Sequence, residues 1–238
     1  MTGPSHPAVI SLVPSVTETL LAWGVRPVAV TRFCEAPGVP AVGGTKNPDV
    51  AAIVRYSPDL VVMDKEENRI SDAAALRDHG VEVYVTHVRG VGDVAPTLAR
   101  LAEAIGAPWP APGFESNLPI SPARAEVLAW VPIWRRPWMT INGGTYGSSI
   151  LAAAAIGNVC ADAPDPYPEL SLEAAAALHP DVVLAPSEPY AFAERHRPEL
   201  EAVAPVVFVD GQDVFWWGSR TPGALDRLRQ LARALATS

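Results

Sequence analysis

The sequence repeats itself once, and this repeat limits the folds that are open to it. The segment NPDVAAIVRYSPDLVVMDKEEN (residues 47–68) has a counterpart in YPELSLEAAAALHPDVVLAPSEPY (residues 167–190). Each copy runs through a proline–acid pair, an Ala-rich helical pattern, Pro-Asp, a hydrophobic strand and an acidic loop. Aligning Pro58 with Pro180 places Glu66 on Glu188. A repeat of this kind indicates two lobes of similar build.

A second similarity precedes each copy. VISLVPSVTETLLAWGV (9–25) and WMTINGGTYGSSILAAAAIGN (138–158) both have the pattern of a strand, a turn, a helix and a terminating glycine. Short, nearly continuous apolar strands that alternate with helices are typical of buried, mostly parallel sheets. The predicted fold class is therefore α/β, with two similar α/β sandwich lobes.

The expected elements are distributed over both halves. We expect strands near 9–13, 27–31, 59–63, 82–86, 127–133, 138–141, 181–185 and 206–209. We expect helices near 16–23, 49–56, 70–79, 93–104, 146–156, 171–178, 189–202 and 222–236.

A proline-rich segment separates the two halves. The predicted N-terminal lobe covers residues 1–106, the connector 107–126 and the C-terminal lobe 127–238. The part GAPWPAPGFESNLPISPARAE (106–126) holds five prolines. Proline inside a helix costs about 3 kcal/mol, so we expect a short, extended or irregular strap here and no continuous helix.

Charge and hydropathy exclude several classes of protein. A net charge of −8 argues against nucleic acid as a partner, because phosphates require a concentrated basic surface. No apolar run approaches the length of about 18 residues that suggests a membrane span. The first residues show no basic segment followed by an apolar one, so no signal peptide is predicted and the expected location is the cytoplasm.

Parallel α/β sheets bind ligands beyond the carboxyl ends of their strands, and polar and aromatic residues crowd into the loops that follow the predicted strands. We expect the two lobes to face each other across a cleft and to hold a small molecule there. The polar candidates are Ser15, Lys46, Asp64, Lys65, Glu66, Asn68, Arg89, Glu188 and Arg220. The cations would meet carboxylates or phosphate on the ligand, and Lys46 and Lys65 are the only lysines in the chain.

Aromatic residues on the same loops favour a flat, apolar or conjugated ligand. In GQDVFWWGSRTPG (211–223), Phe215, Trp216 and Trp217 are adjacent, and one core surface cannot accommodate all three. We therefore expect at least one of them to line the cleft. The aromatic candidates of the second lobe are Trp134, Trp138, Tyr146, Tyr167, Tyr190, Trp216 and Trp217, and packing at the sheet edges is the alternative for each.

Two further hypotheses use other chemistry. Glu66 and Glu188 could divide acid and base roles in a cytoplasmic enzyme, or they could cap the helices that follow them. A bare metal ion is the other alternative, for which His87 is the candidate ligand because it follows a strand; zinc needs three or four such ligands. Ser15 and Glu18 are also spaced as a capping box.

The sequence resembles the class III, or helical-backbone, periplasmic binding proteins of ABC importers for vitamin B12, iron siderophores and haem. The resemblance rests on VISLVPSVTETLLAWG, VGGTKNPDVAAIVRYSPDLVV, YPELSLEAAAALHPDVVL and SRTPGALDRL, in that order along nearly the whole chain. The similar branch is the cobalamin-binding or "helical backbone metal receptor" one.

The resemblance implies a ligand and a partner. The ligand would be a corrinoid, haem, a siderophore or another metal chelate, contacted by Phe33, Tyr167 and the pair Trp216–Trp217. Glu173 would occupy the position that docks onto an ABC permease, whereas the equivalent position of the first lobe is Ala51. Members of the family are usually periplasmic or lipid-anchored outside the cytoplasm.

Overall fold

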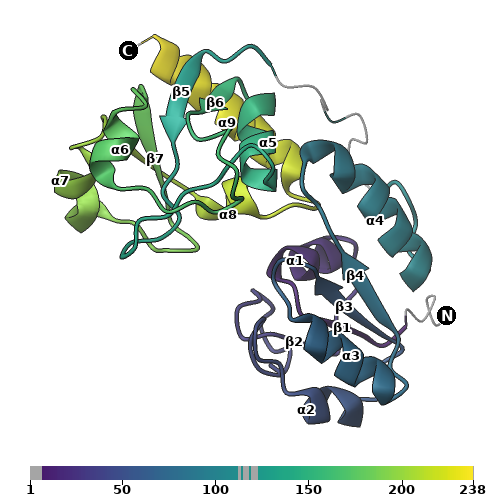
Figure 1. Ribbon diagram of the computed structural model, residues 1–238. Helices are drawn as coiled ribbons and strands as arrows, with labels where there is room; N and C mark the ends of the chain where they lie inside the picture. Colours follow the sequence, from purple (N-terminus) through teal and green to yellow (C-terminus); the bar gives the residue numbers. More distant parts are fainter. Residues whose placement is uncertain (1–6, 112–113, 115–117, 119–122, 238) are drawn as a thin grey trace. The chain divides into compact units, whose positions relative to one another are not determined.

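The computed structural model describes residues 7–111, 114, 118 and 123–237, and these form two compact units. Unit 1 comprises Met1–Val88, Val94–Ser116 and Trp217–Ser219. Unit 2 comprises Arg89–Asp93, Asn117–Trp216 and Arg220–Ser238. Each unit is an α/β sandwich built on a four-stranded parallel sheet, which confirms the predicted fold class (Figure 1).

The sheet of unit 1 has the order β2-β1-β3-β4, and all neighbouring strands are parallel. Its strands are β1 (Val9–Ser11), β2 (Ala29–Val30), β3 (Leu60–Asp64) and β4 (Val83–Thr86). Every residue of β1 and β3 is buried. These strands therefore need helices on both faces, and the continuous apolar runs of the sequence have this cause.

Four helices surround this sheet, namely α1 (Pro14–Ala22), α2 (Val50–Arg55), α3 (Ile70–Asp78) and α4 (Val91–Ile105). One core layer joins Ile53 of α2 and Leu76 of α3 to Ile10 and Met63 of the sheet. The side chain of Asp49 caps α2 by accepting a hydrogen bond from the N–H of Ala52 at 2.8 Å.

Unit 2 repeats the strand order of unit 1. Its sheet has the order β6-β5-β7-β8, again all parallel. The strands are β5 (Val127–Trp130), β6 (Ile156–Asn158), β7 (Val182–Pro186) and β8 (Val206–Val209). The helical segments are α5 (Tyr146–Ala153), α6 (Leu172–Ala176), η1 (Glu194–His196), α7 (Arg197–Leu200), α8 (Gly211–Phe215) and α9 (Thr221–Ala236).

Unit 2 forms the short helix α8, which the sequence did not predict, and differs from the sequence predictions in three other places. No strand forms over 138–141; Met139 instead makes isolated bridges to Trp134 and Glu169. The helix predicted over 146–156 ends at Ala153, and the next residues enter β6, a strand too short to show a pattern. The helix predicted over 189–202 is confined to η1 and α7, because the chain after β7 first forms a loop that contains Pro189.

The described part of the connector (107–111, 114, 118 and 123–126) contains no helix, as the prolines predict, and the other connector residues lie outside the description. Trp109 anchors the start of the connector on unit 1. Its ring centroid lies 6.0 Å from that of Trp23, at the end of α1, and 5.2 Å from that of Phe114.

Candidate functional site

In each unit, the loops at the carboxyl ends of the parallel strands carry most of the predicted ligand-binding residues. In unit 1 these loops follow β1, β3 and β4 and the short strand β2; in unit 2 they follow β5, β6, β7 and β8. In each sheet the strands are parallel, so their carboxyl ends lie along the same edge, and the helices that follow return the chain to the opposite edge. We call the edge at the carboxyl ends of the strands the loop edge.

Asp64 and Asn68 form the scaffold of the loop that follows β3. The carboxylate of Asp64 accepts hydrogen bonds from the Thr86 hydroxyl at 2.7 Å and from the N–H of Glu66 at 2.9 Å. Asn68 donates to the carbonyls of Leu12 and Thr45 and accepts from the N–H of Asp64. Burial raises the pKa of Asp64. The structure thus commits both side chains to the protein, although the sequence suggested ligand contacts.

Charged side chains of both signs lie on the same loop edge of unit 1. Lys46 donates from Nζ to the carbonyl of Glu66, and Nε2 of His87 lies 4.0 Å from the Glu66 carboxylate. Lys65 is exposed. Three of the predicted residues therefore come together here, with Lys46 bound to a backbone oxygen that does not neutralise its charge.

Phe33 is the exposed aromatic residue of this edge. Its side chain is 52 % exposed, and the guanidinium of Arg32 stacks over its ring at 4.8 Å. Ser15 is instead buried in the first turn of α1, and its hydroxyl has no hydrogen-bond partner among the described residues. The capping box predicted for Ser15 and Glu18 is wrong, because α1 begins at Pro14 and its N-cap is Val13.

The histidines do not assemble a metal site in the described part of the chain. There, no three His, Cys, Asp or Glu side chains are grouped so that they could hold a metal ion. His87 pairs with Glu66, His196 is buried, and His79 and His179 are exposed near the ends of α3 and α6. His6 lies outside the described residues.

An aromatic ladder runs through unit 2 from the core to the surface. Its rings, in order, are Trp130, Trp138, Phe192, Tyr190 and Trp134. Trp138 and Phe192 are stacked with an interplanar angle of 6°. Trp130 is fully buried, whereas Trp134 is 45 % exposed. The ladder therefore presents one indole at the surface and supports it from beneath.

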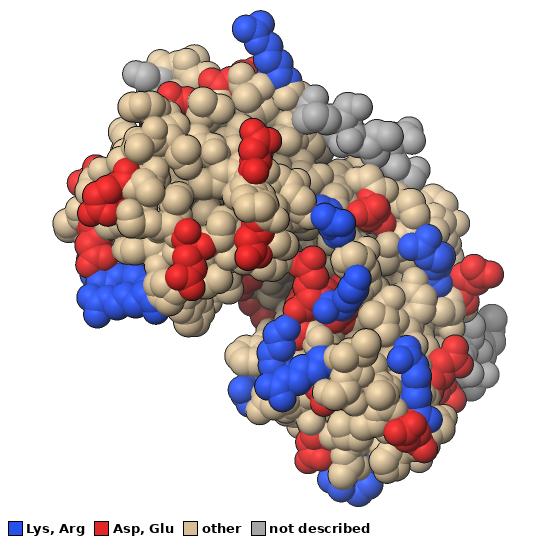
Figure 2. Space-filling view, viewed as in Figure 1, with Lys and Arg blue, Asp and Glu red and all other residues tan. Residues whose placement is uncertain are grey.

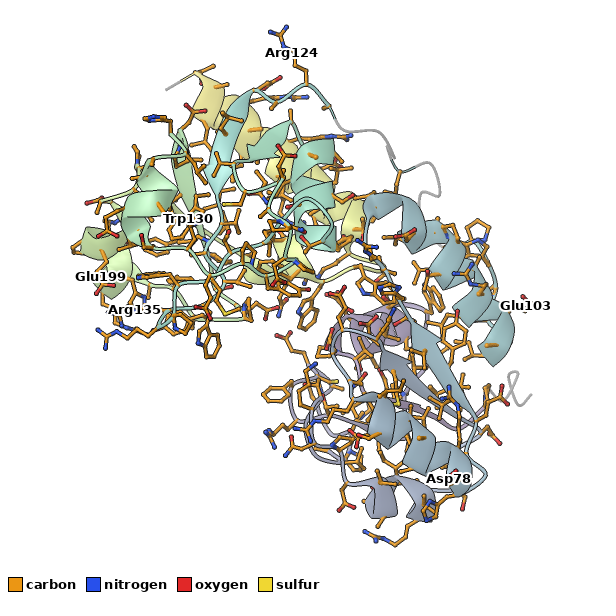
Figure 3. The ribbon with its side chains drawn as sticks, in the orientation of Figure 1. Asp78, Glu103, Arg124, Trp130, Arg135 and Glu199 are labelled. Atoms are coloured by element: carbon orange, nitrogen blue, oxygen red, sulfur yellow. The ribbon has the colours of Figure 1, made fainter. Side chains whose placement is uncertain are left out.

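Ion pairs and hydrogen bonds surround the outer end of this ladder. Arg135 makes two hydrogen bonds to the carboxylate of Glu199, from Nε at 2.9 Å and from Nη2 at 2.5 Å (Figure 3). His196 faces the Tyr190 hydroxyl, with Nε2 and Oη 3.4 Å apart. No sequence pattern indicates these pairs, because the first of them joins residues that are 64 positions apart.

The three adjacent aromatics of the C-terminal loop have different environments. Phe215 ends α8, Trp216 is half-buried beneath the guanidinium of Arg220 at 5.4 Å, and Trp217 is buried with 5 % exposure in unit 1. Tyr146 is also buried, where its hydroxyl lies 3.0 Å from that of Thr221. Burial raises the pKa of Tyr146. Trp217 and Tyr146 are core residues in this conformation.

Arg220 belongs to an ion cluster between α8 and α9. Its Nη1 donates to Asp213 at 3.0 Å and its Nη2 to Gln212 at 2.8 Å. Arg227 donates twice to the same buried carboxylate, at 2.6 Å each. The guanidinium of Arg220, which the sequence assigned to the ligand, is engaged by residues of its own unit.

The remaining candidates lie in loops of unit 2 and, in the case of Glu173, at the start of α6. Arg89 donates from Nε to the carbonyl of Gly144 at 3.2 Å. Glu188 is packed tightly against the start of α8, since a Cβ at Gly211 would lie 2.5 Å from its Cγ. Tyr167 is 39 % exposed. Glu173 is exposed in the first turn of α6, where backbone and Ser171 hydrogen bonds lower the pKa of its carboxylate.

Figure 2 shows basic and acidic side chains interspersed over the visible face of each unit, without a broad basic field. Among the described helices, none combines the length and the apolar character that a membrane crossing requires.

Comparisons with known proteins identify relatives across most of the chain, although no protein-family model matches it. The vitamin B12-binding protein of Salmonella choleraesuis is 27 % identical over 190 residues, which cover 75 % of this chain and 71 % of that protein. The periplasmic vitamin B12-binding protein BtuF of Vibrio cholerae superposes with a TM-score of 0.77 at 18 % identity, covering 98 % of this chain and 99 % of that one.

A haem-binding protein shares the fold as well. The periplasmic haem-binding protein RhuT of Roseiflexus sp. RS-1 has a TM-score of 0.78 at 19 % identity, covering 98 % of this chain and all of that one. The structural and the sequence comparisons thus indicate the same group of binding proteins. The chain shares the α/β fold of these periplasmic binding proteins and is similar in sequence to vitamin B12-binding proteins.

Proposed function

We propose that this protein is the substrate-binding component of an ABC-type importer and that it binds a flat metal chelate such as a corrinoid or haem. Relatives named for vitamin B12 binding and structures of haem-binding proteins support this ligand class. They also favour binding over the alternative of an enzyme that uses Glu66 and Glu188.

The observation that carries the proposal is the exposure of large aromatic side chains on the loop edges. Phe33 in unit 1 is 52 % exposed, and Trp134 and Tyr167 in unit 2 are 45 % and 39 % exposed. Exposed apolar surface of this kind marks interaction sites, and rings stack well on flat conjugated partners. The support of Trp134 by Tyr190 holds its ring in place before the ligand arrives.

Cations on the loop edge of unit 1 add polar recognition. Lys46 and Lys65 are exposed, and charge-assisted hydrogen bonds from such groups to carboxylates or phosphate are the stronger class. We assign them to acidic groups at the periphery of the ligand.

Titration with cyanocobalamin and with hemin tests the proposal, with quenching of tryptophan fluorescence as the readout. We expect binding of at least one compound, and we expect Phe33→Ala and Trp134→Ala each to weaken it about tenfold, which corresponds to about 1.4 kcal/mol. Tyr56→Ala is the matched control. Tyr56 is 41 % exposed but follows the end of α2, at the edge of the sheet away from the loops. Equal affinities of all four proteins would contradict the proposed site.

The relatives also bear on partner and location. Both superposed structures are named periplasmic, and this supports a site of action outside the cytoplasm instead of the cytoplasmic location predicted from the first residues. An ABC permease is the proposed partner, and exposed Glu173 on α6 is the proposed docking acid. Fractionation of native cells and a pull-down with wild-type and Glu173→Ala protein test these two points; recovery in the cytosolic fraction would refute the location.

A further inference from the structure

One short segment of unit 2 contacts both loops that carry the outer rings of the aromatic ladder. The segment is η1 with α7, and its contact residues are His196 and Glu199. His196 touches Tyr190, in the loop after β7. Glu199 binds Arg135, which adjoins Trp134 in the loop after β5. Trp134 and Tyr190 in turn meet edge to face, with ring centroids 5.6 Å apart.

The hydrogen bonds of His196 indicate which ring nitrogen carries the proton when the ring is neutral. Its Nδ1 accepts a hydrogen bond from the backbone N–H of Ala193 at 3.1 Å. A ring nitrogen that accepts carries no proton, so the neutral ring has its proton on Nε2 and donates it to the Tyr190 hydroxyl. His196 therefore fixes the loop backbone with one nitrogen and the Tyr190 side chain with the other.

Arg135 connects the two contacts. Besides its paired bonds to Glu199, it interacts electrostatically with the side chain of Tyr190. Two-point contact between guanidinium and carboxylate fixes orientation as well as distance. The Tyr190 hydroxyl thus lies beside His196 of the η1–α7 segment, and the segment binds the nearby Arg135 through Glu199.

We propose that His196 and Glu199 are positioning residues that hold Trp134 and Tyr190 as a fixed aromatic platform for the ligand, and that protonation of His196 loosens the platform and weakens binding. This inference rests on the proposed function, because it assumes that the ligand stacks on Trp134. It goes further in assigning a pH-dependent release to the same surface.

The environment of His196 explains why protonation is disruptive. A doubly protonated ring has two donors, so its Nδ1 would face the N–H of Ala193 donor to donor. The charged groups that act on His196 are Arg135, Arg195 and Glu199, so a new positive charge would lie near two arginines and one carboxylate. Burial, with the two arginines, lowers the pKa of His196, and release is therefore expected on the acid side of the ordinary histidine range.

The test compares wild type with His196→Gln, His196→Phe and His79→Gln between pH 7.5 and 5.5, with cyanocobalamin and hemin as probes. Glutamine retains one acceptor and one donor and does not titrate, so His196→Gln should bind within about twofold of wild type at pH 7.5. It should also lack the acid-side loss of affinity. His196→Phe should bind about tenfold more weakly at pH 7.5. His79→Gln, at an exposed position of unit 1, should keep the wild-type pH profile.

A measurement without ligand separates this inference from the proposed function. The fluorescence of Trp134 is obtained as the difference between wild type and Trp134→Phe, and its quenching by acrylamide is followed with pH. Quenching should rise as the pH falls in wild type and stay constant in His196→Gln. A constant value in wild type, or equal pH profiles of binding in wild type and His196→Gln, would overturn the positioning role. If neither probe binds wild type, the proposed ligand class is wrong, and the fluorescence alone decides the role of His196.

Discussion

Asn68 and Asp64 are joined by a hydrogen bond from the backbone N–H of Asp64 to Oδ1 of Asn68, 2.7 Å long and buried. The amide nitrogen of Asn68 donates to the carbonyl of Leu12, which follows β1, and to that of Thr45. One side chain thereby connects the ends of two neighbouring strands with a third loop. The loop edge of unit 1 depends on this connection for its shape.

Replacing Asn68 by alanine should lower the free energy of unfolding by about 1–3 kcal/mol, because it leaves buried backbone groups without partners. Urea denaturation measures the change. Asn47→Ala is the control, since Asn47 is exposed, and its effect should stay within about 0.5 kcal/mol. Equal effects of the two substitutions would show that the Asn68 bonds contribute nothing.

Trp217 and Trp216 should respond differently to alanine. Trp217 is 5 % exposed, so Trp217→Ala should cost about 3–5 kcal/mol through the cavity it leaves. Trp216 is half-buried, so Trp216→Ala should lower the free energy of unfolding clearly less than Trp217→Ala does. Thermal unfolding of the two variants compares them directly. A larger loss for Trp216→Ala would mean that the assignment of Trp217 to the core is incorrect.

Gly218 cannot accept a side chain without damage. Its φ is 131°, and a Cβ there would overlap the Thr19 hydroxyl oxygen, which accepts a hydrogen bond from the N–H of Ser219 at 3.0 Å. Gly218→Ala should therefore destabilise the protein by more than about 1 kcal/mol.

Gly223→Ala is the matched control for Gly218→Ala. Gly223 lies in α9, and a Cβ there would meet the flexible end of Arg227. Because alanine is the better helix former by about 1 kcal/mol, this variant should be neutral or slightly more stable. Urea denaturation measures the stability of both variants. A Gly218→Ala variant as stable as wild type would contradict the close contact of Gly218 with Thr19 of α1.

Removal of the Asp213 carboxylate should lower the free energy of unfolding. It receives hydrogen bonds from Arg220 and Arg227, and the Arg220 side chain is 15 % exposed. Asp213→Ala should cost about 3 kcal/mol because it leaves a mostly buried charge unpaired. Asp226→Ala, which breaks an exposed pair with Arg229, should cost less than about 0.5 kcal/mol. Similar losses of unfolding free energy in the two variants would show that the buried cluster stabilises the protein no more than the exposed pair does.

The stability of the protein should depend on His196 at mildly acid pH. Because the folded state lowers its pKa, the unfolded chain binds more protons between that value and the ordinary one of about 6.5. Stability is therefore full above about pH 6.5 and is lost as the pH falls through the lowered pKa. His196→Gln should flatten this part of the curve, as measured by urea denaturation at pH 7.5, 6.5 and 5.5. An unchanged slope would show that His196 does not titrate on unfolding.

The sequence predicted the architecture well because the repeat carries the strand order. Pro58 and Pro180 precede β3 and β7, which occupy the same place in their two sheets. Local signals failed where tertiary contacts decide the conformation. β6 has only three residues, one of them a glycine, and it forms because α5 ends three residues earlier and returns the chain beside β5.

The candidate residues were harder to assign than the fold. The sequence placed Asp64, Asn68, Tyr146 and Trp217 in or directly beside loops that follow strands, but residue type does not tell whether such a side chain points outward or holds the loop itself. His196 and Glu199 were missed as functional candidates for a related reason. Their partners are Tyr190 and Arg135, and the pairing with Arg135 spans 64 positions of the chain.

Trp217–Ser219 has a consequence for how the protein can be dissected. These three residues are grouped with the N-terminal unit, where the N–H of Ser219 is bonded to Thr19 of α1. A fragment that stops at the connector would lack this tripeptide and expose the patch of α1 that it covers. Splitting the gene at its proline-rich middle would thus yield a first half that needs a peptide from the far end of the chain to complete its surface.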